Sequence, residues 1–189
     1  GDRWRTGRMI YPPGNERLLL EPAHPSPIHR SAPSTDDLWT SPELMAIVQY
    51  ALGKISFDLA SCEAANQTIQ ADFYFDKSNR FQTGHHLVRW TTGFWCHPPA
   101  SQVEEFAAIV ATKAIKGAML CPAHTDWGWW QGLLLSADFT VFLASPIRFT
   151  DPASGRQCRN TEAYSLFVWG LRPSWFWELG TIVEAHCGS

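Results

Sequence analysis

Short apolar runs alternate with segments of helical periodicity along most of this chain, and this alternation constrains the fold more than any other feature. Six apolar runs are expected to be strands, at 55–60, 71–75, 92–96, 118–123, 139–144 and 163–170. Apolar residues at helical spacing predict helices around and between them, at 42–52, 63–69, 101–115 and 125–136. Strands that alternate with helices favour an α/β fold, with a largely parallel central sheet as the middle of three layers.

The two ends of the chain differ from this middle part in composition. Residues 1–34 carry six prolines and five arginines, and proline at this density excludes helix because it removes backbone donors. We predict an extended arm at 1–34, one folded domain at 35–172 and an aromatic tail at 173–189, in which a further helix is expected. The arm is either ordered against a partner or disordered. A long loop is expected at 147–160.

Charge alone does not mark this chain as a nucleic-acid-binding protein. Fifteen Lys and Arg against eighteen Asp and Glu give a net charge of −3, which excludes the strongly basic classes but leaves a local basic face open. Ten tryptophans are many for this length and favour either tight aromatic packing or a broad partner surface. Trp175, Phe176 and Trp177 are consecutive, so we expect at least one of them to be exposed.

The five cysteines indicate free thiols rather than a disulfide framework, because their number is odd and no Cys-x-x-Cys pair occurs. Free cysteines favour an intracellular, reducing compartment. No apolar stretch approaches the ~20 residues of a membrane span, so no membrane partner is expected. The chain starts at Gly1 rather than Met, which leaves a removed targeting segment and organelle import open.

Two histidines lie near cysteines, as Cys96-His97 and as Cys121 with His124. Structural zinc sites use paired short-range ligands, which this spacing does not provide, so we predict no metal site. A Cys96 nucleophile activated by His97 is not expected either, because neighbours on a strand point to opposite faces.

Polar residues and prolines lie at the carboxyl ends of three of the expected strands. Asp58 lies near the end of the first, Cys96-His97-Pro98-Pro99 at the end of the third, and Pro122-Ala123-His124 at the end of the fourth. In parallel sheets, ligands bind beyond the carboxyl ends of the strands. These ends are therefore the candidate functional site.

Seven segments carry a resemblance to a known family, in their order and approximate spacing. They are DDLWTSPEL, FDLASCEAAN, ADFYF, FWCHPPAS, GAMLCPAHTDWGWW, VFLASPIRF and AYSLFVWG. From about residue 35 to residue 170 the chain resembles the phage-type DNA N6-adenine methyltransferases, the Dam-like family. The resemblance implies a Rossmann-like methyltransferase fold and, in an active member, transfer of a methyl group from S-adenosylmethionine to adenine.

The resemblance also identifies the expected base pocket. The family motif is Asn-Pro-Pro-Tyr, in which the amide or acid accepts from the adenine amino group and the ring stacks on the flipped base. Here the motif reads His97-Pro98-Pro99-Ala100. A neutral imidazole accepts through one nitrogen only, and Ala100 offers no ring. These catalytic positions are therefore predicted to be altered or vestigial.

The cofactor side is altered as well. The family's Phe-Asp-Leu-Asp reads here as Phe57-Asp58-Leu59-Ala60, so the second acid is missing. The resemblance implies Asp58, Ala60 and Asn66 as cofactor-binding positions. S-adenosylmethionine is the expected cofactor of an active chain, and a chain that has lost catalysis is expected to bind none.

Four further positions are implied to contact nucleic acid or a partner: His124, which replaces the family's arginine, Asp126, Trp130 and Arg148. The tryptophans at 127, 129 and 130 are either helix-packing residues, which we favour, or a platform for base stacking.

Our leading hypothesis is a methyltransferase-fold protein with lost or weakened catalysis. It would act as a structural or nucleic-acid-associated subunit that contacts DNA, RNA or protein partners through the arm and exposed aromatic residues. The alternative is an active DNA adenine-N6 methyltransferase with an atypical motif. A protein or small-molecule methyltransferase on the same fold is a third possibility, because fold does not fix substrate.

Overall fold

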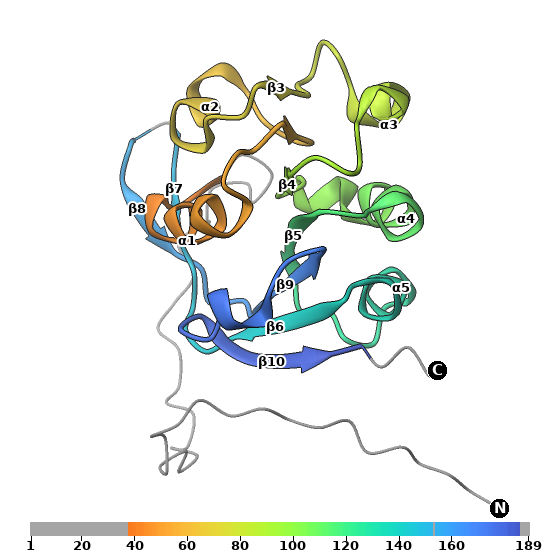
Figure 1. Ribbon diagram of the computed structural model, residues 1–189. Coiled ribbons are helices and arrows are strands. Elements are labelled where there is room, and N and C mark those ends of the chain that lie inside the picture. The colour runs from red at the N-terminus through yellow and green to blue at the C-terminus, as the bar shows by residue number, and fades with distance from the viewer. Residues whose placement is uncertain (1–37, 153, 186–189) are drawn as a thin grey trace, which may run out of the picture.

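The computed structural model describes residues 38–152 and 154–185. In this part of the chain a seven-stranded sheet lies between two sets of helices (Figure 1). The predicted arm at 1–34 lies outside the described residues.

The main sheet has a parallel half and an antiparallel half. Its order is β10-β6-β9-β5-β4-β2-β3, with β2 (Phe57–Asp58), β3 (Phe73–Tyr74), β4 (Phe94–Cys96), β5 (Gly117–Pro122), β6 (Phe139–Leu143), β9 (Tyr164–Trp169) and β10 (Gly180–Glu184). The strands β3, β2, β4 and β5 pair in parallel, whereas β9, β6 and β10 pair antiparallel. The predicted α/β class is confirmed, and the parallel half gathers the carboxyl ends of four strands at one edge.

Helices cover both faces of this sheet (Figure 1). On one face lie α1 (Pro42–Leu52) and α2 (Glu63–Ile69), and on the other lie α3 (Phe81–Gly84), α4 (Val103–Lys113) and α5 (Gly128–Ser136). Short 3₁₀ turns are η2 (His85–Leu87), η3 (Ala100–Gln102) and η4 (Pro173–Trp175). The three layers agree with a methyltransferase-like fold. Among the described helices, none is long and apolar enough to cross a membrane.

Local sequence explains where α1 begins and ends. The Ser41 hydroxyl accepts from the Leu44 N–H at 3.4 Å, and Pro42 occupies the first turn, where its missing N–H costs nothing. Gly53 ends the helix at φ 74, a conformation that favours glycine. The helix α5 differs from prediction because residues 125–127 form a turn, so it starts at Gly128 rather than at a Thr-Asp cap.

A second, three-stranded sheet replaces the long loop that was predicted at 147–160, so that prediction was wrong. Its order is β1-β7-β8, antiparallel, with β1 (Trp39–Thr40), β7 (Arg148–Thr150) and β8 (Gln157–Arg159). Strands of two or three residues are too short to show a period, so they could not be predicted from the sequence. Between β7 and β8 the Gly155 N–H donates to the Asp151 carbonyl at 2.8 Å.

The helix predicted in the tail is also wrong, because residues 180–184 are the edge strand β10, paired with β6. Of the three consecutive aromatic residues, Phe176 is fully buried and Trp177 is 47% exposed. The expectation that one of them is exposed is confirmed.

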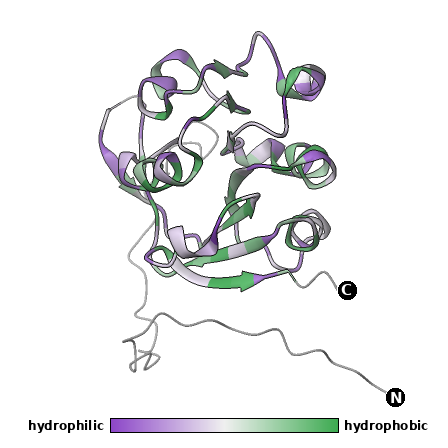
Figure 2. Ribbon diagram, viewed as in Figure 1, coloured by the Kyte–Doolittle hydropathy of each residue, from purple (hydrophilic) through white to green (hydrophobic). Residues whose placement is uncertain are grey.

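Two apolar clusters, one on each face, hold the layers together. Successive residues of β4 show the division, since Phe94 and Cys96 pack toward α4 and α5 while Trp95 packs toward α1 and α2. Apolar residues accordingly follow the strands of the main sheet in Figure 2. The buried strands hold the carboxyl edge of the parallel half in a fixed geometry.

Candidate functional site

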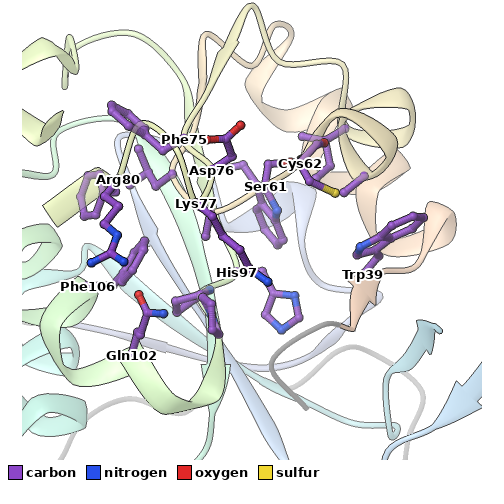
Figure 3. Close-up of a pocket in the computed structure, with 18 of the residues that line it drawn as sticks. Trp39, Ser61, Cys62, Phe75, Asp76, Lys77, Arg80, His97, Gln102 and Phe106 are labelled. Atoms are coloured by element: carbon purple, nitrogen blue, oxygen red, sulfur yellow. Dashed lines mark hydrogen bonds between the residues drawn. The ribbon is translucent and has the colours of Figure 1, made fainter. Parts of the chain in front are cut away.

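A cavity of about 1080 Å³ opens beyond the carboxyl ends of β2, β3 and β4 (Figure 3). Its lining includes Trp39 from β1, Ala60 after β2, Asp76 after β3 and His97 after β4. Its volume is slightly above the ~300–1,000 Å³ usual for ligand sites. The cavity therefore lies where a parallel sheet is expected to bind its ligand.

His97 is held in the cavity wall by the second sheet. Its Nδ1 lies 3.1 Å from the Thr40 hydroxyl oxygen, and its ring stacks on Phe149 with centroids 5.0 Å apart and planes 12° apart. The ring of Tyr164 meets it edge-on at 6.2 Å. Burial lowers the pKa of His97 to about 4, so the imidazole is neutral at pH 7.

Pro98 and Pro99 follow His97 and also line the cavity. Ala100 begins the 3₁₀ turn that leads into α4. His97, Pro98 and Pro99, the first three residues of the predicted motif, thus line the cavity. Ala100 is not among the lining residues and carries a methyl group in place of the family's ring.

Asp58 lies beneath this site rather than in it. The carboxyl is fully buried and does not line the cavity. Its Oδ1 accepts from the Ala60 N–H at 3.2 Å, while its Oδ2 has no hydrogen-bond partner among the described residues. Burial raises the pKa of Asp58 to about 7, against the smaller opposing effects of hydrogen bonds from Ser61 and Ala60.

The other two predicted cofactor positions have different placements. Ala60 lines the cavity. Asn66 instead braces the end of α2, where its amide donates to the Ala71 carbonyl at 3.1 Å and accepts from the Ala71 N–H at 2.9 Å.

Asp76 is a cavity residue that the sequence reasoning missed. Its Oδ1 accepts from the Ser78 hydroxyl, the Ser78 N–H and the Asn79 N–H, at 2.6, 2.6 and 3.1 Å. These hydrogen bonds, that of the Ser78 hydroxyl first, hold the pKa of Asp76 below its usual value, so the group is ionised at pH 7. An acid directly after the strand ADFYF was the signal that could have identified it.

The four predicted partner positions do not converge on the cavity. His124 Nε2 lies 2.6 Å from Glu162 Oε1, beside the ring of Trp127. Asp126 is exposed in the turn before α5, and Arg148 is exposed on β7.

Trp130 has a packing position, since it is 2% exposed and its ring meets those of Phe142 and Phe167. Trp129 is buried as well, whereas Trp127 is 52% exposed. Two of these three tryptophans therefore pack in the core, as the favoured interpretation predicted.

The cysteines of the described chain, Cys62, Cys96, Cys121 and Cys158, are free thiols. Burial raises the pKa of both Cys96 and Cys121 well above the ordinary value, which makes them poor nucleophiles. Among residues 38–152 and 154–185, no group of three or more His, Cys, Asp or Glu side chains could hold a metal ion.

Comparison with known families agrees with this geometry. The family model described as DNA N-6-adenine-methyltransferase (Dam) matches residues 30–174, which is more than half of the chain. The chain belongs to the Dam family. No curated protein and no solved structure gives a match. The resemblance inferred from the seven segments is therefore confirmed at the level of the family.

The Dam family implies S-adenosylmethionine as the cofactor of an active member, and two residues that line the cavity suit such a ligand. Hydroxyl groups such as those of a ribose suit the ionised carboxylate of Asp76. The small side chain of Ala60 permits a ligand to approach the backbone after β2. Both residues would hold the cofactor.

Proposed function

We propose that this Dam-family chain binds S-adenosylmethionine in the cavity but transfers the methyl group to adenine poorly or not at all. It would serve as a nucleic-acid-associated subunit of a larger assembly. The observation that carries the proposal is the altered motif at the cavity. His97 lines the cavity in place of the family's acceptor, and Ala100, directly after the lining residue Pro99, has no ring. We also propose that the α/β fold of this chain is a Rossmann-like methyltransferase fold.

The cofactor side supports binding. The cavity is large, and Asp76 provides a fixed, ionised acceptor at its edge. We therefore depart from the expectation that a chain with weakened catalysis binds no cofactor. When bound, S-adenosylmethionine supplies an electrophilic methyl group on its sulfonium sulfur.

The base side supports weak transfer. Methyl transfer to an amino group is a positioning task, in which the reacting atoms must be about 3–3.5 Å apart. Loss of a stacking ring costs ~1–3 kcal/mol of base binding by analogy with single-strand binders. Ala100 has no ring, and the His97 ring is already packed against Phe149. A flipped adenine would therefore be held loosely.

The partner is proposed to be DNA or RNA, with proteins as further partners. The exposed Trp127 ring beside His124, and the exposed Arg148, suit contacts with nucleic acid. Trp177 is 47% exposed and suits a protein contact. The free thiols agree with an intracellular, reducing compartment.

Two measurements on the full chain test this function. Calorimetric titration with S-adenosylmethionine should show binding, and Asp76→Ala should weaken that binding about tenfold because a charge-assisted hydrogen bond is lost. Asp126→Ala is the matched control, since Asp126 is exposed and does not line the cavity. Absence of binding by the unchanged chain would refute the cofactor half of the proposal.

Methyl transfer is measured with tritiated S-adenosylmethionine and unmethylated duplex DNA. Little or no incorporation is expected. The double variant His97→Asn with Ala100→Tyr should raise incorporation about tenfold or more, because it provides both an acceptor and a stacking ring. Rapid adenine methylation by the unchanged chain would instead establish the active enzyme.

A further inference from the structure

The His97 ring is clamped by two residues that are partners in the second sheet. Thr40 on β1 and Phe149 on β7 are directly opposed in register. Thr40 is 4% exposed and Phe149 is fully buried. The Thr40 hydroxyl oxygen lies 3.1 Å from Nδ1 of the ring, and the Phe149 ring stacks on its face with centroids 5.0 Å apart. The orientation of the His97 ring is therefore set by β1 and β7, and not by β4, which precedes His97 in the chain.

The buried Thr40 hydroxyl decides which ring nitrogen carries the proton. A buried hydroxyl hydrogen needs an acceptor. Among residues 38–152 and 154–185, the one hydrogen-bond partner of this hydroxyl is His97 Nδ1. If Nδ1 carried a hydrogen, it would donate to the hydroxyl oxygen, and the hydroxyl hydrogen would have no acceptor among the described residues. The hydroxyl therefore donates, Nδ1 accepts, and the proton of the neutral ring is on Nε2.

Nε2 is the ring nitrogen left for a ligand, since His97 lines the cavity and its Nδ1 is occupied. We propose that His97 presents an Nε2–H donor to the cavity, so that the pocket takes a base with an acceptor where adenine has its amino group. Such bases are the 6-oxopurines and the 4-oxopyrimidines. This inference deepens the proposed function and rests on its claim that the chain associates with nucleic acid.

The hydrogen-bond chemistry of the bases gives the preference its direction. The adenine N6 group is a donor, whereas guanine O6 and thymine O4 are acceptors. An Nε2–H that faces an amino group leaves two donors unpaired, and a site built for one polarity rejects the other strongly. At the position of the adenine amino group, a 6-oxopurine or a 4-oxopyrimidine carries an oxygen atom, which leaves no nitrogen there to take a methyl group. This polarity therefore also explains binding without transfer.

The tautomer can be observed directly. In the full chain, labelled with ¹⁵N at histidine and kept at pH 7.5, long-range ¹H–¹⁵N correlation shows which nitrogen of each ring is protonated. His97 is assigned from the signals that disappear in His97→Asn. Protonated Nε2 is expected, with Thr40→Ser retaining it and Thr40→Val producing a mixture of tautomers. Protonated Nδ1 in the unchanged chain would overturn the proposal.

Base preference is measured with two short duplexes that differ at one mismatched position, which holds either adenine or hypoxanthine. The mismatch lowers the cost of flipping. The hypoxanthine duplex should bind about tenfold more tightly. Thr40→Val should reduce that ratio toward one, and Thr40→Ser should preserve it.

A preference for adenine would overturn the inference. Equal binding of the two duplexes together with protonated Nε2 would overturn the claim that His97 contacts the base, and would leave the cofactor half of the proposed function standing. The titration with S-adenosylmethionine is independent of the tautomer, so failure of the proposed function and failure of this inference are distinguishable.

Discussion

Asp58→Asn should stabilise the protein, and more strongly at pH 8 than at pH 5. The folded-state pKa of Asp58 is raised from 3.8 to about 7 by burial, so folding favours its neutral form. The stability that this group contributes is full at low pH and is lost as the pH rises from about 4 to 7. Asparagine keeps an acceptor for the Ala60 N–H but cannot ionise.

The magnitude follows from the size of the shift. A rise of about 3 pKa units corresponds to a penalty of about 4 kcal/mol once the pH exceeds 7, as an upper bound. About half of that penalty is still absent at pH 5. The stabilisation by Asp58→Asn should therefore grow by about 2–3 kcal/mol between pH 5 and pH 8.

The ionisation of His97 changes stability with pH in the opposite direction. Its effect should become measurable in Asp58→Asn, where the effect of Asp58 is removed. The pKa of His97 falls from 6.5 to about 4 on folding, so its contribution is full above pH 6.5 and is lost as the pH falls toward 4. In the unchanged chain the effects of Asp58 and His97 oppose each other between about pH 4 and 6.5. Asp58→Asn should make stability fall on acidification, and His97→Asn should make it fall on alkalinisation.

Urea unfolding followed by tryptophan fluorescence gives the free energy of unfolding at each pH. Asp126→Asn serves as the control, because Asp126 is exposed. A stabilisation by Asp58→Asn that is equal at pH 5 and pH 8 would refute the reasoning, since the burial of Asp58 would then not be linked to its ionisation.

Two further predictions concern the scaffold. Gly117→Ala should destabilise by about 1–3 kcal/mol, because a Cβ there would lie 2.2 Å from the Phe94 ring. Gly132→Ala lies inside α5, and apart from its chain neighbours and the backbone of its own helix no atom lies within 4 Å of the added carbon. It should stabilise by about 0.5–1 kcal/mol, and thermal melts of both variants check this contrast. Asn66→Ala should cost about 1–3 kcal/mol of unfolding free energy by removing both hydrogen bonds to Ala71. Its affinity for S-adenosylmethionine, measured by calorimetry, should stay unchanged if Asn66 only braces α2.

The elements with a clear period could be predicted from the sequence. The helix α4 and the strand β5 carry enough apolar residues for the period to be read, and they lie close to their predicted ranges. The position of His97 beyond a parallel strand was also predictable, because the two prolines end that strand. The sequence therefore identified the wall of the cavity that carries the motif.

The second sheet and the burial of Asp58 could not be predicted, because they depend on contacts between distant parts of the chain. Thr40 and Phe149 are more than one hundred residues apart, and strands of two or three residues give no signal of their pairing. The burial of Asp58 depends on how α1 and α2 cover β2, which no local pattern specifies. The positions of these residues relative to the cavity can therefore be seen only in the structure.

Thr40, which contacts His97, lies on β1, the first strand of the described residues. A truncation directly before β1 would place a charged amino terminus next to the strand that orients the imidazole. The length of chain retained ahead of β1 is therefore a variable in any experiment on ligand preference. Two preparations that differ only upstream of residue 38 should be compared before their affinities are assigned to the cavity.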